Sequence, residues 1–283
     1  MARIQTSGSS PGATADAALR QIQAKARYVF TPEEYAVLTG RAPGGAALKM
    51  ALQRLARQGR ITLATKRPVN WLIVPAEHSH YGAPPVDWWL DSCLKQTEPN
   101  YYVALLSAAR HWGSSHYAVQ STQVMVGKPR HALTVGRLRV DFFTKRDLAD
   151  TPTVIVRDTV APWRVSTREA TLLDLVRHQT IVGGLEAIVR VASDLSVELN
   201  AASMTQALNA LDQVPAAQRI GFVLDRIGAA KAAKAVARWL SARRPQTQPL
   251  EPQRSAHRST PRIDPSWNIA FDADQLAVIE ELK

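Results

Sequence analysis

Near the N-terminus, helix start and stop signals follow one another so closely that few folds can accommodate them. Thr31 can cap a helix that begins at Pro32, and two glutamates in its first turn favour the positive end of the helix dipole. Gly40 ends this helix, and leucines at helical spacing predict another helix over 46–58, which Gly59 closes. Two short helices therefore follow each other with only a turn between them.

The flanking segments complete a recognisable order. The sequence predicts helices over 15–27, 32–39 and 46–58, then strands over 61–64 and 71–74 around a loop over 66–70. Three helices followed by a β-hairpin form the winged helix-turn-helix pattern, which we predict for residues 14–78. In that pattern the third helix enters the major groove of DNA, led by its N-terminal residues.

The charge of this region favours a nucleic-acid partner. No acid occurs between Glu34 and Glu77, whereas seven cations do, so the surface would not repel a phosphate backbone. Glycines before the third helix allow close approach of a phosphate to the backbone. Side chains that could read bases are few there, so shape readout is expected to contribute to specificity. The candidate DNA contacts are Arg41, Gly44, Gly45, Lys49, Gln53, Arg57, Lys66 and Arg67.

A second basic cluster lies between 128 and 139. The whole chain has a net charge of +11 and a pI near 10.1, which favours polyanionic partners. We predict that the cluster forms a β-hairpin with a charged tip, which either grips DNA or is simply a solvated hairpin. Its residues are Lys128, Arg130, His131, Arg137 and Arg139, and we add Lys128, Arg130 and Arg137 to the candidate DNA contacts.

The rest of the chain predicts an α+β protein. Residues 1–13 are expected to be a disordered leader, and the prolines and glycine near 76–86 suggest a boundary. A larger mixed domain is predicted over 79–243, with a small sheet between 119 and 165 and a helical C-terminal half. The helices are expected over 87–95, 101–112, 166–179, 184–195, 203–211, 215–227 and 231–243. An extended basic tail is predicted over 244–283, with a possible final helix over 272–282.

Two stretches of this larger domain resemble a known family. They are YYVALLSAARHWG at 101–113 and VSTREATLLDL at 165–175, with valine-rich strands between them and the winged helix before them. Together they resemble the AbiEi-type antitoxins of type IV (abortive infection) toxin–antitoxin systems, over roughly residues 15–240. The resemblance implies a repressor that binds inverted repeats in its own operator, and a C-terminal domain that counteracts a nucleotidyltransferase-like toxin. The basic tail after 243 departs from the family pattern.

The same stretches also have a purely structural interpretation. We predict that 101–112 is an amphipathic helix. Ser166 can cap the next helix, with Glu169 completing a capping box, and the leucines that follow then fill the core.

The motifs of four enzyme classes are incomplete or absent. A nucleotidyltransferase would need a paired Asp-x-Asp after Gly113, but the next strand has none. Asp141 could be the first acid of a nuclease, yet no acid-x-Lys follows on the next strand. A P-loop and a nucleophile elbow are absent. We therefore predict a protein that is not an enzyme and needs no cofactor or metal.

The remaining signals concern location and alternatives. Cys93 is the only cysteine, lies among leucines and is expected to be buried in a helix. No spanning apolar run or hydrophobic signal core occurs, so we expect a cytoplasmic protein with no membrane partner. The predicted partners are double-stranded operator DNA and a cognate nucleotidyltransferase-like toxin. The alternatives are a metal-dependent nuclease that a winged helix targets to DNA, and a protein-interaction scaffold.

Overall fold

The chain folds into two compact units. The computed structural model describes residues 14–115, 120–146, 148–157, 159–252 and 261–283. The first unit contains residues up to 97 together with 133–139 and 157–162. The second contains 98–132, 140–156 and 163–283. The predicted leader at 1–13 lies outside the described residues.

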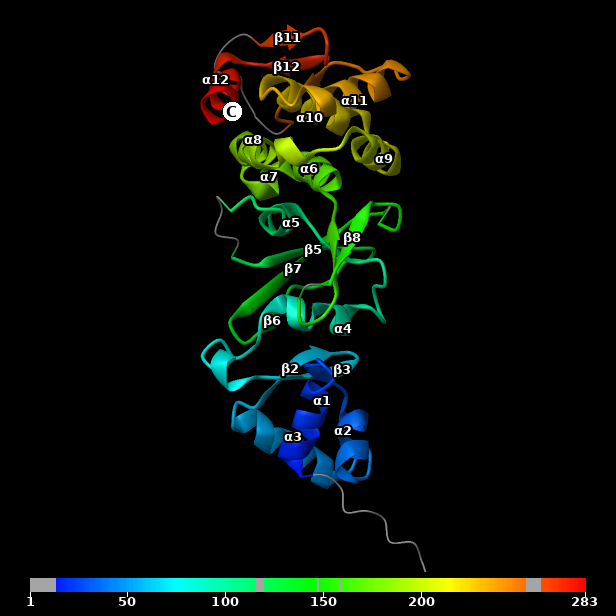
Figure 1. The fold of residues 1–283 in the computed structure, drawn as a ribbon, viewed down its shortest axis with the longest axis vertical. Coiled ribbons are helices and arrows are strands. Elements are labelled where there is room, and N and C mark those ends of the chain that lie inside the picture. Colours follow the sequence, from blue (N-terminus) through cyan, green and yellow to red (C-terminus); the bar gives the residue numbers. More distant parts are fainter. Residues whose placement is uncertain (1–13, 116–119, 147, 158, 253–260) are drawn as a thin grey trace, which may run out of the picture. The chain divides into compact units, whose positions relative to one another are not determined.

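The first unit combines short helices with a small antiparallel sheet (Figure 1). Its strands lie in the order β1-β3-β2, with Val29 opposite Leu72 and Ile61 opposite Ile73. Two 3-10 turns and a short helix follow the sheet. The elements are α1 (Ala15–Gln23), β1 (Val29–Phe30), α2 (Pro32–Thr39), α3 (Ala46–Arg57), β2 (Ile61–Lys66), β3 (Val69–Ile73), the turns Ala76–His78 and Val86–Trp88, α4 (Leu90–Leu94) and β6 (Leu133–Val135).

The predicted start and stop signals are confirmed in α2 and α3. The Thr31 hydroxyl accepts a hydrogen bond from the Glu34 amide at 3.2 Å, and Pro32 occupies the first turn of α2. Gly40 ends α2 with φ of 64°, a left-handed conformation that glycine adopts without strain. Local chemistry therefore sets both ends of α2, and Gly59, with φ of 67°, follows the end of α3.

Two boundaries in the first unit differ from the prediction. The loop predicted over 66–70 is only a tight turn, because β2 continues to Lys66 and β3 begins at Val69. The Thr65 hydroxyl donates to the Pro68 carbonyl at 2.6 Å and accepts from the side-chain Nδ2 of Asn70 at 2.8 Å, which closes the turn. The helix predicted over 15–27 ends at Gln23.

One apolar core holds the first unit together. Leu19 and Ile22 of α1 and Leu48, Leu52 and Leu55 of α3 pack with residues of β1, α2 and the hairpin. Cys93 is buried in α4, as the sequence predicted.

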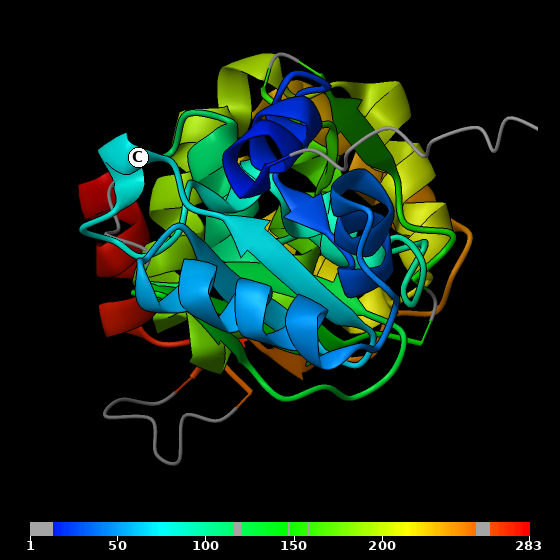
Figure 2. The ribbon, with the colours of Figure 1, turned by 90° about the horizontal axis from the view of Figure 1, so that it is seen from below.

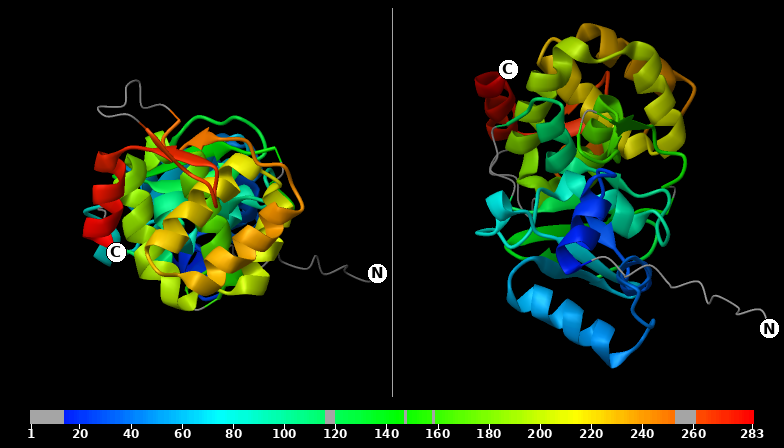
Figure 3. Two further views of the ribbon diagram at one scale, coloured as in Figure 1. Left: turned by 90° about the horizontal axis from the view of Figure 1, so that it is seen from above. Right: turned by 60° about the horizontal axis from the view of Figure 1, so that its bottom comes forward.

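In the second unit, a mixed sheet lies beside a layer of helices (Figure 3). Its strands run in the order β7-β5-β4-β9-β8. Pairs β5–β7 and β4–β9 are parallel, whereas β4–β5 and β8–β9 are antiparallel. The elements are β4 (Tyr102–Val103), α5 (Leu105–His111), β5 (Thr122–Val126), β7 (Leu138–Thr144), β8 (Thr153–Val156) and β9 (Trp163–Ser166). Together with the helices, this sheet confirms the predicted α+β class.

The helix predicted over 101–112 is wrong in its first residues. Tyr102 and Val103 form β4, which pairs with β5 on one side and β9 on the other, and α5 begins only at Leu105. Both strand residues are fully buried. A short run of aromatic and branched residues fits a central strand as well as a helix, and periodicity alone does not separate the two.

The helical layer follows β9 directly. Its elements are α6 (Arg168–Arg177), α7 (Gln179–Val182), α8 (Gly184–Leu195), the 3-10 turn Ser196–Glu198, α9 (Ala201–Leu211), α10 (Val214–Arg226) and α11 (Ala230–Ser241). The predicted cap of α6 is corrected: Ser166 belongs to β9, and Thr167 accepts from the Ala170 amide. The Glu169 carboxylate instead accepts from the Asn200 amide at 2.8 Å, which joins α6 to the start of α9.

The C-terminal residues form part of the second unit's core. The sequence predicted an extended tail over 244–283, but its described part contains β10 (Gln248–Pro249) and β11 (Arg262–Asp264). These strands pair with β12 (Ile269–Phe271), and the predicted final helix is confirmed as α12 (Ala273–Leu282). The reason is packing: a Cβ on Gly221 of α10 would lie 2.1 Å from the Trp267 ring, so that ring lies directly against the helix backbone.

Candidate nucleic-acid interface

Helix α3 has one buried face and one exposed face. Leu48, Leu52 and Leu55 enter the core of the first unit, as the leucine spacing predicted. In Figure 2, α3 lies along the outer side of the unit, in front of the hairpin. The side chains on its exposed face are Lys49, Met50, Gln53, Arg54 and Arg57, and none of them is acidic.

The start of α3 is open to solvent. Gly44 has φ of 72°, and Gly45 caps the helix without any side-chain hydrogen bond to the first amides. Gly44, Ala46 and Ala47 are exposed. Backbone amides at a helix N-terminus carry partial positive charge, so this end of α3 can accept an anion without steric obstruction.

Not every cation of the first unit is available to a partner. Arg60 lies 2.8 Å from the Asp16 carboxylate, and the Arg41 guanidinium lies 6.0 Å from the centre of the Tyr35 ring. Arg60 is one of the seven cations between Glu34 and Glu77, and the Asp16 carboxylate offsets its charge. In the described residues, no ion pair is recorded for Lys49, Arg54, Arg57, Lys66 or Arg67.

The tip of the β2–β3 hairpin carries two of those cations. Lys66 ends β2 and Arg67 begins the turn, and both are exposed. The hydrogen bonds of Thr65 to Pro68 and Asn70 fix the turn beneath them. The tip therefore presents two charges from a rigid base.

The second basic cluster does not form one charged hairpin tip. Arg137 follows Gly136 in the turn between β6 and β7, in the first unit, and its amide donates to the Tyr81 carbonyl at 2.8 Å. Lys128 and Arg130 precede β6 and belong to the second unit. Arg130 is half-buried, with its guanidinium 5.1 Å from the centre of the Phe142 ring. Of the candidate contacts in this cluster, only Arg137 lies at the tip.

The second unit holds a buried cluster that the sequence analysis missed. Lys145 follows β7, Asp174 lies on α6 and Tyr102 lies on β4, so three elements meet there. The Lys145 Nζ lies 3.0 Å from the Asp174 carboxylate and 3.0 Å from the Tyr102 hydroxyl. That hydroxyl donates to the other Asp174 oxygen at 2.7 Å. Asp174 and Tyr102 lie in the two family-like stretches, but only topology brings Lys145 to them.

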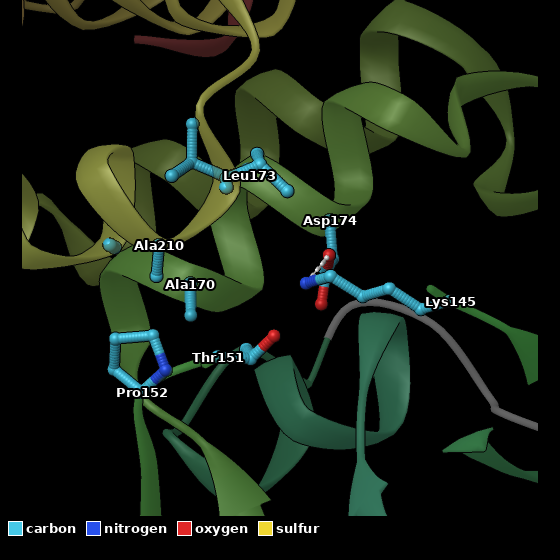
Figure 4. A pocket seen from close by; sticks show the side chains of 9 residues that line it. Lys145, Thr151, Pro152, Ala170, Leu173, Asp174 and Ala210 are labelled. Carbon is cyan, nitrogen blue, oxygen red and sulfur yellow. Dashed lines mark hydrogen bonds and ion pairs between the residues drawn. The ribbon is translucent and has the colours of Figure 1, made fainter. Parts of the chain in front are cut away.

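This cluster is closed to solvent. The side chains of Lys145 and Asp174 are 4% and 1% exposed. Burial, and then the charge of Asp174, hold the pKa of Tyr102 well above its ordinary value. The adjoining cavity measures about 10 Å³, room for roughly one water molecule, and Thr151, Pro152 and Ala210 also line it (Figure 4). Such an arrangement fixes α6 to the sheet.

Asp141 and His78 carry side chains that could bind a metal ion, and they lie in different units. Asp141 of β7 accepts a hydrogen bond from the Ser121 hydroxyl at 2.6 Å. His78 packs edge-on against the Trp88 ring, 5.1 Å between centres. Within the described ranges, no three His, Cys, Asp or Glu side chains converge where they could hold a metal ion. The same ranges contain no helix long and apolar enough to cross a membrane.

Comparisons with known proteins find one matching family profile and a similar fold. Residues 102–226 match the sequence profile of the AbiEi antitoxin C-terminal domain, which confirms the predicted family resemblance over that segment. The crystal structure of the RV2827C protein from Mycobacterium tuberculosis is similar over 96% of this chain and 98% of its own, with a TM-score of 0.64 and 17% identity. At that identity the likeness concerns the fold alone. No protein with a curated description matches the chain.

Proposed function

We propose that this chain is a DNA-binding repressor and the antitoxin of a toxin–antitoxin system. The order α1, β1, α2, α3, β2, β3 with a three-stranded sheet supports a winged helix-turn-helix in the first unit. In this proposal α3 enters the major groove and the β2–β3 tip contacts the backbone beside it. The match of residues 102–226 supports the antitoxin role of the second unit.

One observation carries the DNA-binding proposal. Five cations on α3 and at the hairpin tip are exposed and have no ion pair among the described residues, and the start of α3 offers backbone amides without a side-chain cap. If each cation meets one phosphate, log K falls against log salt concentration with a slope of about −4.5. Gln53 and Met50 are the exposed uncharged side chains that can reach base edges, so they contribute few specific contacts.

The test is fluorescence-anisotropy binding to the DNA upstream of the gene and to a scrambled duplex, over a salt series. Lys49→Glu and Arg67→Glu should each weaken binding by at least about tenfold, because each replaces an attraction to phosphate by a repulsion. Lys25→Glu is the matched control: it changes the charge equally at an exposed position of the same unit, outside α3 and the hairpin.

The outcomes separate the two parts of the proposal. Preference for the upstream duplex, lost in both variants and kept in the control, supports a specific repressor. Equal binding to both duplexes, or tight binding by both variants, refutes it. The antitoxin role is tested by co-expression with a nucleotidyltransferase-like protein from a neighbouring gene: restored growth supports it, and growth arrest despite expression refutes it.

A further inference from the structure

A groove runs between α9 and α11 on the surface of the second unit. Its volume is about 640 Å³. Leu199, Ala202 and Ala235 supply an apolar floor. Lys231, Lys234 and Arg238 form its basic rim, one turn apart along a single face of α11. The groove therefore combines small apolar contacts with three positive charges.

The rim charges are unsatisfied within the described chain. All three side chains are exposed, no ion pair is recorded for them in the described residues, and no acid lines the groove. Like charges at this spacing repel each other, so an occupant that brings carboxylates would be stabilised. No aromatic ring lines the groove, and single-stranded nucleic acid would need one for base stacking. An acidic helix with a small apolar stripe fits these features.

The chain itself carries such a helix. On α12, Ala273, Asp274, Ala277, Glu280 and Glu281 are exposed and follow one another at helical spacing on one face. No ion pair is recorded for Glu280 or Glu281 in the described residues. The alanines match the narrow apolar floor, and the two glutamates, in the last turn, match the three cations of the rim.

Helix α12 and the groove lie at different edges of the helical layer within one molecule. Helix α12 packs against α8, and the Ser193 hydroxyl donates to the Leu282 carbonyl at 3.2 Å. Figures 1 and 3 show α12 at one edge of the helical layer and α9 at the opposite edge. We propose that the acidic face of α12 docks in the α9–α11 groove of a second copy of this chain.

The two surfaces lie on opposite sides of the unit, so the contact is head-to-tail. A contact of this kind does not close on itself in a pair and can add further copies. The contact joins one face of a ten-residue helix to one groove, and every copy carries +11, so it is weak in free solution. Copies held side by side on DNA have a high effective concentration, and there the contact would make their binding cooperative. The contact itself does not depend on the proposed DNA binding.

Sedimentation equilibrium of the full chain, without DNA and at low salt, tests the contact. The wild type should depart from 31.1 kDa at high concentration. Lys234→Glu and Glu281→Lys should each weaken association by at least about tenfold. An equimolar mixture of the two variants should recover heterodimers, because the reversed charges match again. Arg244→Glu, an exposed cation just after α11 and outside the groove, is the control and should associate like the wild type.

Each result decides the proposal. Recovery in the mixture, with Arg244→Glu unaffected, supports docking of α12 in the groove. A wild type that stays monomeric at about 0.3 mM, where weak protein contacts are populated, overturns it. Equal effects of Lys234→Glu and Arg244→Glu also overturn it, since net charge alone would then explain them. If Lys234→Glu weakens binding of a duplex and leaves self-association unchanged, the groove is a nucleic-acid surface and the proposal fails.

Discussion

Lysines in the two units have opposite environments. Lys49 on α3 is exposed, with no ion pair recorded in the described chain, whereas the Lys145 side chain is 4% exposed and bonded to Asp174 and Tyr102. The first lysine adds to an external field that a polyanion can neutralise. The second is neutralised internally and contributes to the position of α6 on the sheet. The net charge of +11 therefore predicts little about binding until buried, paired cations are distinguished from exposed, unpaired ones.

The contrast predicts that substitutions in the two units change different quantities. In the second unit they should change the free energy of unfolding. On the exposed face of the first unit they should change affinity for DNA and leave stability almost unchanged.

The largest effect is expected for Asp174→Ala. It removes the partner of a buried lysine and the acceptor of the Tyr102 hydroxyl, so the free energy of unfolding of the second unit should fall by about 3–5 kcal/mol. Urea denaturation followed by circular dichroism measures the loss.

Two variants sharpen this prediction. Glu186→Ala removes the partner of Arg190 in an exposed pair of the same unit and should cost less than about 1 kcal/mol. Replacing both buried partners, with Lys145→Met and Asp174→Leu, should recover much of the stability that Asp174→Ala loses. An Asp174→Ala protein as stable as the wild type would contradict the role assigned to the cluster.

The next effect concerns Gly221 on α10. A Cβ there would lie 2.1 Å from the Trp267 ring, so Gly221→Ala should displace the ring and cost about 1–3 kcal/mol of unfolding free energy. The Trp267 indole also donates to Asp225 at 3.1 Å, a bond that the displacement would strain. Gly127→Ala is the control, because a Cβ there meets its nearest atom at 3.7 Å. Equal stability of the two variants would contradict the packing argument.

Signals that act over a few residues were predictable from the sequence. Thr31, Pro32 and Gly40 set the ends of α2, and leucine spacing gave the buried face of α3. Strand β4 was not predictable in the same way, because Tyr102 and Val103 form a strand only when β5 and β9 flank them. Tertiary packing therefore determined the conformation of that segment.

The candidate DNA contacts and the buried cluster differ in the same way in how far the sequence predicts them. The candidate contacts on α3 followed from one continuous stretch of sequence, although the pairing of Arg60 with Asp16 spans 44 residues and was missed. The buried cluster joins Lys145 to Tyr102 and Asp174 across 43 and 29 residues. No local pattern marks Lys145, so only the folded chain identifies it.

A smaller effect is expected from the pH dependence of His178. Burial lowers the pKa of this imidazole below its ordinary 6.5, against the opposing influence of Asp174. The unfolded chain therefore binds a proton at higher pH than the folded chain does. Stability is complete above about pH 6.5 and falls as pH decreases toward the folded pKa. In unfolding measured from pH 8 to 5, His178→Gln should flatten this fall relative to the wild type. A parallel fall in both proteins would rule His178 out as its source.

The smallest change in stability is expected on the exposed face of α3. Here an unpaired and a paired arginine, three residues apart, can be compared directly. Arg57→Ala should alter the free energy of unfolding by less than about 0.5 kcal/mol, because Arg57 has no ion pair recorded in the described chain. It should nevertheless reduce the slope of log K against log salt by about 0.9, the contribution of one phosphate contact. Arg60→Ala is the matched variant: Arg60 already pairs with Asp16, so its loss should change the slope less. Arg60→Ala could instead reduce the slope as much as Arg57→Ala does. The ion pair with Asp16 would then not prevent Arg60 from binding DNA, and exposure rather than pairing would determine which cations bind phosphate.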